Sequence, residues 1–387
     1  MFSLLKYHVR SVLIRWRSTL ATILGIALVV AVFVMVQALA VGLEKSSGNT
    51  GDSRNLLITR KGALAESTSL ITRAQLNILR YLPGIALDGA GQPLVSADLL
   101  IVINMARLAA EGAANVLVRG VSPAGISLRP QVSLVEGRWF IPGKREVVVS
   151  RRLASRFAHL GVGDTFRTSG QDFLVVGHFD AQRSAFDSEI WLDADEARGV
   201  FDREDYCSAL LRPASEEAAA NLVRILESDR RLKVKAVREV SYYKEQTKSA
   251  APIRILGNFL AIVMSVGAVF AAMNTLYASV GARTREIGTL RVLGFRRRSI
   301  LAGFLFEGAV LAGIGGVMGC LFALPMHGYS TGTIGFETFA ESVFDFQITP
   351  ALALEGIVFS ICLGIVGSFL PALRAARLPV IASLKSV

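Results

Sequence analysis

The sequence predicts an α-helical membrane protein with four transmembrane helices and a mixed α/β domain inserted between the first and second helices. Two features support this fold class: four long apolar stretches, and one long polar insert after the first of them. A helix that spans a bilayer needs about 20 mostly apolar residues. The expected spans are 19–43, 252–282, 299–326 and 351–373, and the insert is 44–251.

The distribution of Lys and Arg predicts which side of the bilayer each segment occupies. The formal net charge is +11, and the basic residues outside the insert lie mainly in 1–18, 283–298 and 374–387. The remaining short segment, 327–350, contains acidic residues but no Lys or Arg. Short loops rich in Lys and Arg stay in the cytoplasm. We therefore expect both termini and 283–298 in the cytoplasm of a bacterium, and 44–251 beyond its cytoplasmic membrane.

The positive charge indicates contact with lipid rather than with nucleic acid. A nucleic-acid-binding protein needs a clustered basic face, and the sequence shows none with aromatic residues beside it. Residues 1–18 have apolar positions near helical spacing, with Lys6, Arg10 and Arg17 elsewhere. Such a helix can lie at the surface of the lipid bilayer, although a positively charged leader that only sets topology explains the same pattern.

The first apolar stretch is expected to remain as an anchor. Ala38-Leu39-Ala40 has the form of a signal-peptidase site. However, the stretch before it is longer than the h-region of a signal peptide, which has about 7–15 residues. Cleavage would also remove one of the four spans and break the charge pattern.

No pattern for catalysis, for a cofactor or for a metal occurs in the sequence. The phosphate-binding pattern G-x-x-x-x-G-K-[ST] is missing, the four His are scattered, and no G-x-S-x-G elbow occurs. Cys207, Cys320 and Cys362 lack the spacing of a disulfide framework or a zinc site, so we expect them to be small buried side chains. We therefore expect a non-catalytic chain that binds no cofactor and no metal.

Residues 44–251 have the strand and helix patterns of a mixed α/β domain that is large enough to bury its own core. The predicted strands are 94–103, 115–121, 146–149, 164–168, 173–179, 189–192 and 232–236, with a hairpin turn at 169–172, and the predicted helices are 151–157 and 215–228. Gly89, Gly91 and Pro93 indicate a loop between two subdomains.

Residues 283–298 differ from an ordinary charged loop. Glu286 and Leu290 recur at helical offsets, Ile287, Leu290 and Leu293 form a compact apolar patch, and Gly294 is placed to end the helix. A short amphipathic helix of mixed charge can dock in a groove of a cytoplasmic partner. A charged loop that only sets topology remains the alternative.

Several strings in the chain resemble those of ABC-transporter permeases of the MacB/FtsX/LolC type. The most specific is Asn274 to Gly294, which includes Arg-Glu-Ile-Gly-Thr-Leu-Arg. Further matches are Arg17 to Ala27, Glu136 to Phe140, Glu146 to Ser150, Val162 to Asp164, Phe173 to Gly177 and Pro371 to Arg377. The resemblance spans nearly the whole chain and is specific for the superfamily, but not for a subfamily.

This resemblance implies that 283–298 contains a coupling helix that sits on an ABC ATPase. The implied coupling residues are Arg285, Glu286, Ile287, Gly288, Leu290, Arg291, Leu293 and Gly294. Because Met1 leads directly into the first helix, the ATPase is expected on another polypeptide, unlike in MacB. ATP and Mg would bind that ATPase, which would act as a dimer with two permease chains, either a homodimer or related paralogues. A periplasmic adaptor and an outer-membrane channel are the further implied partners. The insert fits MacB or LolC better than FtsX, which has a smaller outer domain.

Two polar residues and two glycines within the expected spans also indicate contacts between helices. Asn274 and Glu307 are the intramembrane polar groups. A charge within a span is usually functional, and we expect Glu307 to pair with Arg298 or to make another polar contact. Gly315 and Gly319 form a G-x-x-x-G pattern that favours close helix packing, within one chain or across a dimer.

Together these features predict mechanotransmission, in which ATP binding and hydrolysis by the partner move the domain beyond the membrane and drive export or extraction of an envelope substrate. A lipid, lipoprotein, peptide or drug all remain open. The alternative is an ATPase-linked regulatory scaffold that activates a periplasmic enzyme. A receptor without an ATPase would leave the pattern of 283–294 unexplained.

Overall fold

The computed structural model describes residues 16–108, 112–246, 251–334 and 340–379. Contacts divide the chain into two compact units. The helix bundle comprises 1–42, 251–329 and 345–387, and the sheet unit comprises 43–250 and 330–344. The amphipathic helix expected over 1–18 and the end of the expected tail lie largely outside the described residues.

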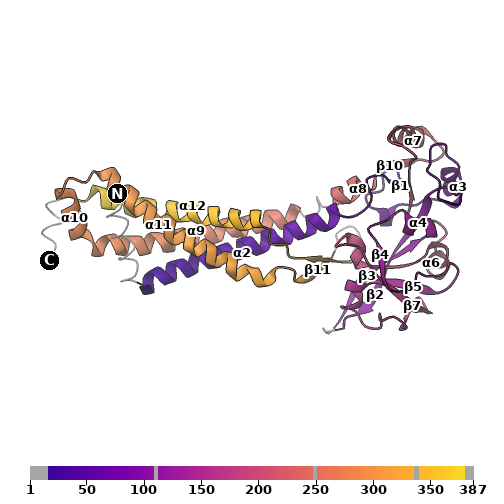
Figure 1. Cartoon of the computed structure of the whole chain (residues 1–387), viewed down its shortest axis with the longest axis horizontal. Coiled ribbons are helices and arrows are strands. Elements are labelled where there is room, and N and C mark those ends of the chain that lie inside the picture. The colour runs from indigo at the N-terminus through magenta and orange to yellow at the C-terminus, as the bar shows by residue number, and fades with distance from the viewer. Residues whose placement is uncertain (1–15, 109–111, 247–250, 335–339, 380–387) are drawn as a thin grey trace. The chain divides into compact units, whose positions relative to one another are not determined.

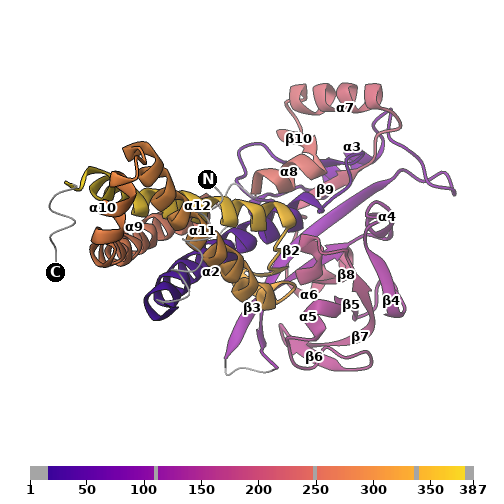
Figure 2. The same cartoon turned by 60° about the vertical axis from the view of Figure 1, so that its left-hand side comes forward.

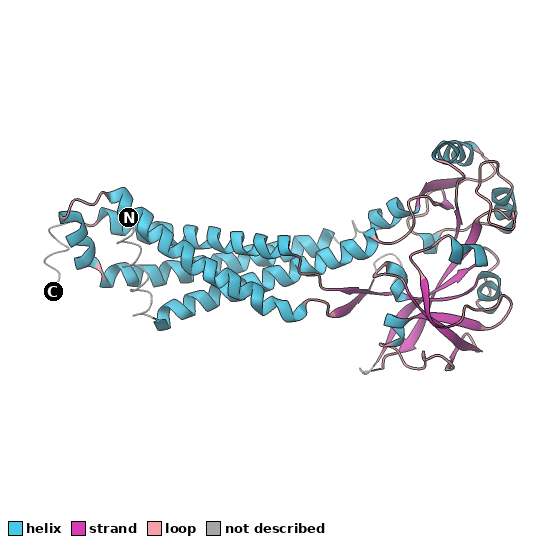
Figure 3. Cartoon of the chain, in the orientation of Figure 1, coloured by secondary structure: helices cyan, strands magenta, loops and turns pink. Residues whose placement is uncertain are grey.

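Four long helices form the bundle, and each is long and apolar enough to cross a membrane. They are α2 (Trp16–Gly48), α9 (Ala251–Ala282), α11 (Arg297–Ala323) and α12 (Pro350–Arg377), and a 3-10 turn, η4 (Leu324–Met326), follows α11. They lie side by side in Figures 1 and 3. The predicted fold class is confirmed. Two helices pass the predicted ends of their spans: α2 reaches Gly48, and α12 runs four residues into the segment expected as a tail.

Glycines on α11 let it approach two neighbours closely. A Cβ at Gly315 would lie 3.0 Å from the Ile23 carbonyl oxygen, and one at Gly319 would lie 2.6 Å from the Ala27 carbonyl oxygen, both on α2. A Cβ at Gly316 would lie 2.2 Å from Oγ of Ser360 on α12. The predicted G-x-x-x-G pattern therefore packs within one chain, against α2, and Gly316 serves the contact with α12. Without a hydrophobic driving force inside lipid, such close packing holds the helices together.

The sheet unit contains a path of paired strands in the order β10-β1-β9-β2-β3-β8-β5-β7-β4, and β6 pairs with β7. The strands are β1 (Leu56–Arg60), β2 (Val95–Ala106), β3 (Ala113–Val121), β4 (Ser133–Gly137), β5 (Glu146–Ser150), β6 (Thr165–Thr168), β7 (Gln171–Asp180), β8 (Glu189–Asp193), β9 (Ser208–Leu211) and β10 (Val234–Arg238). The helices are η1 (Glu66–Thr68), α3 (Arg73–Arg80), α4 (Pro123–Ser127), α5 (Arg151–Ala154), η2 (Ala185–Ser188), α6 (Ala194–Val200), α7 (Glu216–Ser228) and α8 (Glu239–Gln246).

Strand β2 joins two lobes of the sheet unit, because its first part pairs with β9 and its later part pairs with β3 (Figure 2). The change of partner falls between Asp98 and Leu99. The loop that contains Gly89 and Gly91 precedes β2 and lies between two elements of the first lobe, α3 and the start of β2. The loop exists, but the prediction that it connects the two subdomains is wrong, because a continuous strand, β2, connects the lobes.

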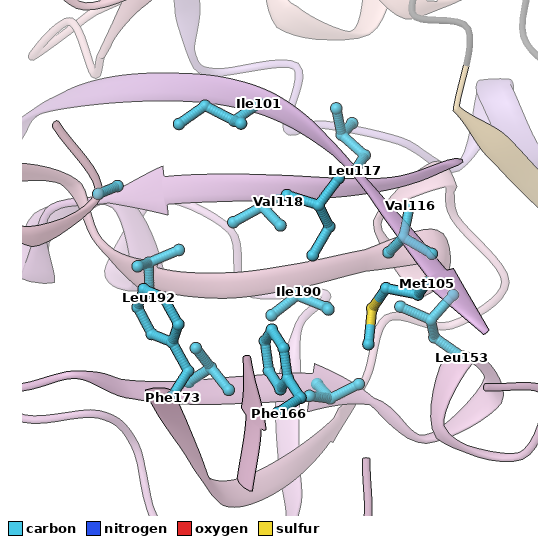
Figure 4. Packing of buried hydrophobic residues seen from close by; sticks show 14 of the residues in the cluster. Ile101, Met105, Val116, Leu117, Val118, Leu153, Phe166, Phe173, Ile190 and Leu192 are labelled. Carbon is cyan, nitrogen blue, oxygen red and sulfur yellow. The ribbon is translucent and has the colours of Figure 1, made fainter. Parts of the chain in front are cut away.

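Each lobe has its own apolar core. In the second lobe, Phe166 and Phe173 of the hairpin β6–β7 pack with Ile190 of β8 and Leu153 of α5 (Figure 4). The predicted hairpin is confirmed, but its turn is shorter than the predicted 169–172: Gln171 and Asp172 belong to β7, and Ser169 and Gly170, both with positive φ, form the turn. Such two-residue turns match the twist of paired strands.

The segment expected as a short loop over 327–350 contains a hairpin, β11 (Ser330–Ile334) and β12 (Glu341–Asp345), that belongs mainly to the sheet unit. Glu341 forms ion pairs with Arg107 and Arg156. The backbone N–H of Val343 donates to Oγ of Ser188 at 2.7 Å. The chain between α11 and α12 is thereby fastened to the sheet unit, which the charge pattern alone did not indicate.

We expect Gly316→Ala to destabilise the bundle by about 1–3 kcal/mol, the usual effect of overpacking. Gly313→Ala is the matched control on the same helix, because its Cβ would meet its nearest neighbour at 3.7 Å, an ordinary contact. Thermal unfolding of both variants in detergent measures the difference. Equal melting temperatures for the two variants would contradict the assigned packing of α11 on α12.

We also expect Asp98→Asn to lower the free energy of unfolding in a pH-dependent way. Burial acts to raise the pKa of Asp98, but the guanidinium groups of Arg129 and Arg119 outweigh it and hold the pKa below its ordinary value. A carboxyl with a lowered pKa stabilises the fold above its ordinary pKa, and this stabilisation is lost as the pH falls through the lowered value. Removing one partner of a buried ion pair costs about 3–5 kcal/mol, so the loss should be of this size at neutral pH.

Urea denaturation of the full chain in detergent, followed by tryptophan fluorescence, measures this loss between neutral and acid pH. The difference in the free energy of unfolding between Asp98→Asn and the unmodified chain should become smaller below about pH 4. Asp172→Asn, at a carboxylate that is 65% exposed, is the control and should change little. If this difference in the free energy of unfolding stays constant down to pH 3, Asp98 is not the ionised carboxylate that we expect.

Candidate functional site

A short helix, α10 (Thr284–Val292), follows α9 after a single intervening residue, Arg283. Backbone hydrogen bonds continue across this residue, from Arg283 N to Val280 O at 3.2 Å and from Ile287 N to Arg283 O at 2.9 Å. Leu293 caps the helix, and Gly294 follows with φ of 91°. The predicted helix end at Gly294 is confirmed, and α10 is joined to α9 without a flexible loop.

The inner face of α10 packs on the ends of three long helices. Ile287 is 3% exposed, and Gly288 is also buried. Ile287 lies in a cluster with buried residues of the neighbouring helices: Val280, Ile300, Phe304, Ala372 and Ala375. Of the predicted coupling residues, Ile287 and Gly288 therefore support α10 from inside and are not part of its exposed surface.

The outer face of α10 combines exposed charge with exposed apolar groups. Arg285 and Glu286 are exposed. Val292 and Leu293 are 62% and 71% exposed, while Leu290 and Arg291 are half-buried. The apolar patch expected from the sequence is thus divided: Ile287 points into the bundle, and Val292 joins Leu293 at the surface. Sequence periodicity gave no signal for Val292, because only the packing partners decide which apolar face is covered.

A buried ion pair fastens the start of α10 to α11. Nη1 of Arg283 lies 3.3 Å from Oε2 of Glu307, and both side chains are 6% exposed. The expectation of an ion pair for Glu307 is correct, but the expected partner, Arg298, is wrong. Arg298 is on the same helix as Glu307 and is exposed. At about 3.6 residues per turn, the two lie on opposite sides of the helix, so Arg298 cannot reach the carboxylate.

Polar side chains also connect α2 with α9. Thr22 donates from Oγ1 to Oγ1 of Thr275 at 2.7 Å, and Gln37 donates from Nε2 to Oδ1 of Asn258 at 2.8 Å. Asn274, the residue selected from the sequence, is exposed on the surface of the bundle next to the first of these contacts. Interhelical hydrogen bonds of this kind contribute about 0.6–2 kcal/mol each in membranes, so they hold α2 and α9 in a fixed register.

The effect of the Arg283–Glu307 pair can be measured with a double-mutant cycle. We expect Arg283→Gln and Glu307→Gln each to destabilise the bundle by about 3 kcal/mol, because each leaves the opposite charge in an apolar site. The double variant should be destabilised by less than the sum of the two single variants, with a coupling energy of at least about 1 kcal/mol. Thermal unfolding in nanodiscs is the measurement. Arg298→Gln, at the partner expected from the sequence, should not change the stability of the bundle. If the losses of stability at positions 283 and 307 are additive, the two side chains do not form a pair.

Comparison with known proteins gives matches along nearly the whole chain. The family model described as the MacB-like periplasmic core domain matches residues 19–227, and the one described as the FtsX-like permease C-terminal matches residues 258–380. The boundary between the two matches falls close to the start of α9.

The individual relatives share about a quarter of their residues with this chain. The uncharacterized ABC transporter permease YknZ of Bacillus subtilis is 25% identical over 99% of this chain and 96% of its own length. The macrolide export ATP-binding/permease protein MacB of Pasteurella multocida is 26% identical over 94% of this chain, which spans 57% of that protein. Among solved structures, the periplasmic region of MacB from Actinobacillus actinomycetemcomitans matches 52% of this chain and 94% of that region, at 13% identity and a TM-score of 0.37.

Proposed function

Because this chain belongs to the MacB/FtsX family of ABC-transporter permeases, we propose that it transmits the work of a separate ABC ATPase through the membrane to its sheet unit. In this proposal ATP and Mg bind the ATPase, not this chain. Both termini and α10 face the cytoplasm, and the sheet unit lies beyond a bacterial inner membrane. The movement drives export or extraction of an envelope substrate.

The observation that supports this proposal most strongly is the construction of α10. Its outer face offers Leu293 and Val292 with Arg285 and Glu286, a combination that suits docking in a groove of a partner. Its inner face is fixed by Ile287 and by the Arg283–Glu307 pair. A partner that moves α10 must therefore also move the ends of the long helices, because packed interiors do not deform continuously.

In this proposal the route from α10 to the sheet unit runs along the chain segments that pass from one unit to the other. Helix α9 begins where the chain leaves the sheet unit, and α2 is held to α9 by the Thr22–Thr275 and Gln37–Asn258 hydrogen bonds. The last residues of α2 belong to the sheet unit. The hairpin β11–β12 links α11 and α12 to the same unit through Glu341. We propose that these three connections carry the movement.

The proposed complex contains two permease chains and an ATPase dimer. A periplasmic adaptor and an outer-membrane channel complete the proposal. These two partners rest on the resemblance of this chain to MacB, not on the geometry of α10.

Co-purification tests the docking surface. We expect Glu286→Lys combined with Leu293→Lys to reduce the amount of ATPase that co-purifies in detergent by about tenfold or more. Truncation of a single central anchor often costs more than 2 kcal/mol of binding free energy, and introduced charges add repulsion. ATP hydrolysis by the reconstituted complex gives a second measure of the same loss.

Two control variants separate docking from folding. Leu64→Lys makes the same substitution as Leu293→Lys at a position of the sheet unit that is 91% exposed, and should leave ATPase binding unchanged. Ile287→Ala removes the inner support and should lower the melting temperature of the bundle while keeping the docking face chemically intact. If the ATPase co-purifies normally with the Glu286→Lys, Leu293→Lys variant, α10 is not the docking element.

A further inference from the structure

The sheet unit contains a buried cluster of charges that no step of the proposed function has used. We name it the ionic junction, and its members are Glu66, Asp98, Arg119, Arg129, Glu189 and Glu239. Each of the six is at most 3% exposed. The cluster brings two guanidinium groups together with four carboxyl groups, and it lies where β2 changes its pairing partner.

Arg119 holds three strands and η1 through directional bonds. It donates to both carboxylate oxygens of Glu189 at 2.7 and 2.9 Å, and from Nη1 to Glu66 at 3.0 Å and to Asp98 at 3.3 Å. Arg129 donates to Asp98 and, from Nε, to Glu239 at 3.2 Å. Paired bonds of this kind fix geometry as well as charge.

Glu239 extends the ionic junction to the chain that follows α2. It is the first residue of α8, and its Oε2 accepts hydrogen bonds from N of Asp52 at 2.9 Å and from Nδ2 of Asn55 at 2.8 Å. Gly51 has φ of 84°, and a Cβ at this position would lie 2.6 Å from Cγ of Glu239. Only glycine both adopts this backbone and permits this approach, so the two chain segments lie in direct contact.

One turn after Glu239, two tyrosines of helix α8, Tyr242 and Tyr243, also contact the ionic junction. The hydroxyl of Tyr243 accepts from Nη2 of Arg119 at 3.3 Å, and its ring meets the ring of Phe186 edge to face with centroids 5.6 Å apart. The hydroxyl of Tyr242 accepts from N of Glu66 at 2.6 Å. Two successive turns of α8 are thus fastened to the ionic junction.

The physical character of these contacts suggests why charges are present. A buried ion pair contributes little net stability compared with apolar side chains of the same volume. Apolar contacts, however, are non-directional, whereas hydrogen bonds from guanidinium groups also fix the orientation of the elements that they join. A cluster of this kind is suited to keep chain segments in one orientation when force is applied to them.

We propose that the ionic junction fastens the segment that follows α2 to the start of α8, so that the sheet unit turns as one rigid body when force reaches it through these two segments. Glu239 is the positioning residue at the centre of this contact. The inference rests on the proposed function for the origin of the force, but not for the rigidity, which can be measured without nucleotide.

The test uses the full chain with its ATPase in nanodiscs, and measures distances between nitroxide labels by electron spin resonance. Labels at Lys45 on α2 and Arg224 on α7, both exposed, report rigidity within the sheet unit. Labels at Arg224 and Tyr329, which is 61% exposed, report movement against the bundle. The labels are attached through p-acetylphenylalanine, so cysteines remain free for the second part of the test.

We expect a narrow Lys45–Arg224 distance distribution in the parent that does not change with a non-hydrolysable ATP analogue. In Glu239→Gln the distribution should become at least twofold wider, and the nucleotide-dependent change between Arg224 and Tyr329 should fall by at least half. Glu146→Gln is the matched control, because Glu146 is 7% exposed and is paired with Arg138 at 2.6 Å in the second lobe. It should leave both measurements unchanged.

A disulfide separates rigidity from general destabilisation. Asn55→Cys with Glu239→Cys places two cysteines opposite each other, one residue beyond the antiparallel pair Leu56–Arg238, close enough to be bridged, in a background with alanine at positions 207, 320 and 362. Within this one variant, the reduced form should have the broad distribution and the oxidised form should regain the narrow one. An oxidised form that stays broad, or a Glu239→Gln variant that stays narrow, would overturn the inference. If the parent shows no nucleotide-dependent change between Arg224 and Tyr329, the proposed function fails instead.

Discussion

The structure of the bundle depends on one constraint: inside a bilayer, every backbone polar group must find its partner within the protein. Long helices satisfy this requirement, and their association must then come from close packing and a few polar contacts. Gly315, Gly316 and Gly319 on α11 allow this packing on two sides at once, towards α2 and towards α12. A displacement of one helix is therefore passed to its neighbours, which is the property that the proposed transmission requires.

Two of the buried charge clusters in the described part of the chain lie at junctions between elements. Arg283 and Glu307 meet where α10 joins the long helices, and the ionic junction lies where the segment after α2 and the start of α8 meet the sheet. Burial of charge without a partner is costly, so such pairs keep the elements in a single arrangement. The two sites resemble each other in this respect, although one lies in the bundle and the other in the sheet unit.

The sequence analysis succeeded where a local pattern of residues is enough to specify a structural element. Long apolar runs predicted α2, α9, α11 and α12, and Gly294 predicted the end of α10. Strand-like segments indicated β2 and β3, and a turn sequence between two such segments indicated the hairpin β6–β7. The strands β1, β4 and β9 were missed, although β5, β6, β8 and β10, which are equally short, were predicted. The hairpin β11–β12 was missed because the charge rule assigns a side of the membrane but no structure.

By itself the sequence determined the number of spans, the position of the inserted domain and the amphipathic helix between the second and third spans, since these follow from the length and composition of contiguous segments. Only the tertiary structure decided that Glu307 pairs with Arg283, that Ile287 faces inward while Val292 is exposed, and that six charged side chains from distant segments share one buried site. Such partners are separated by tens to more than a hundred residues. Their proximity results from how the helices and strands pack, and no local pattern along the chain records it.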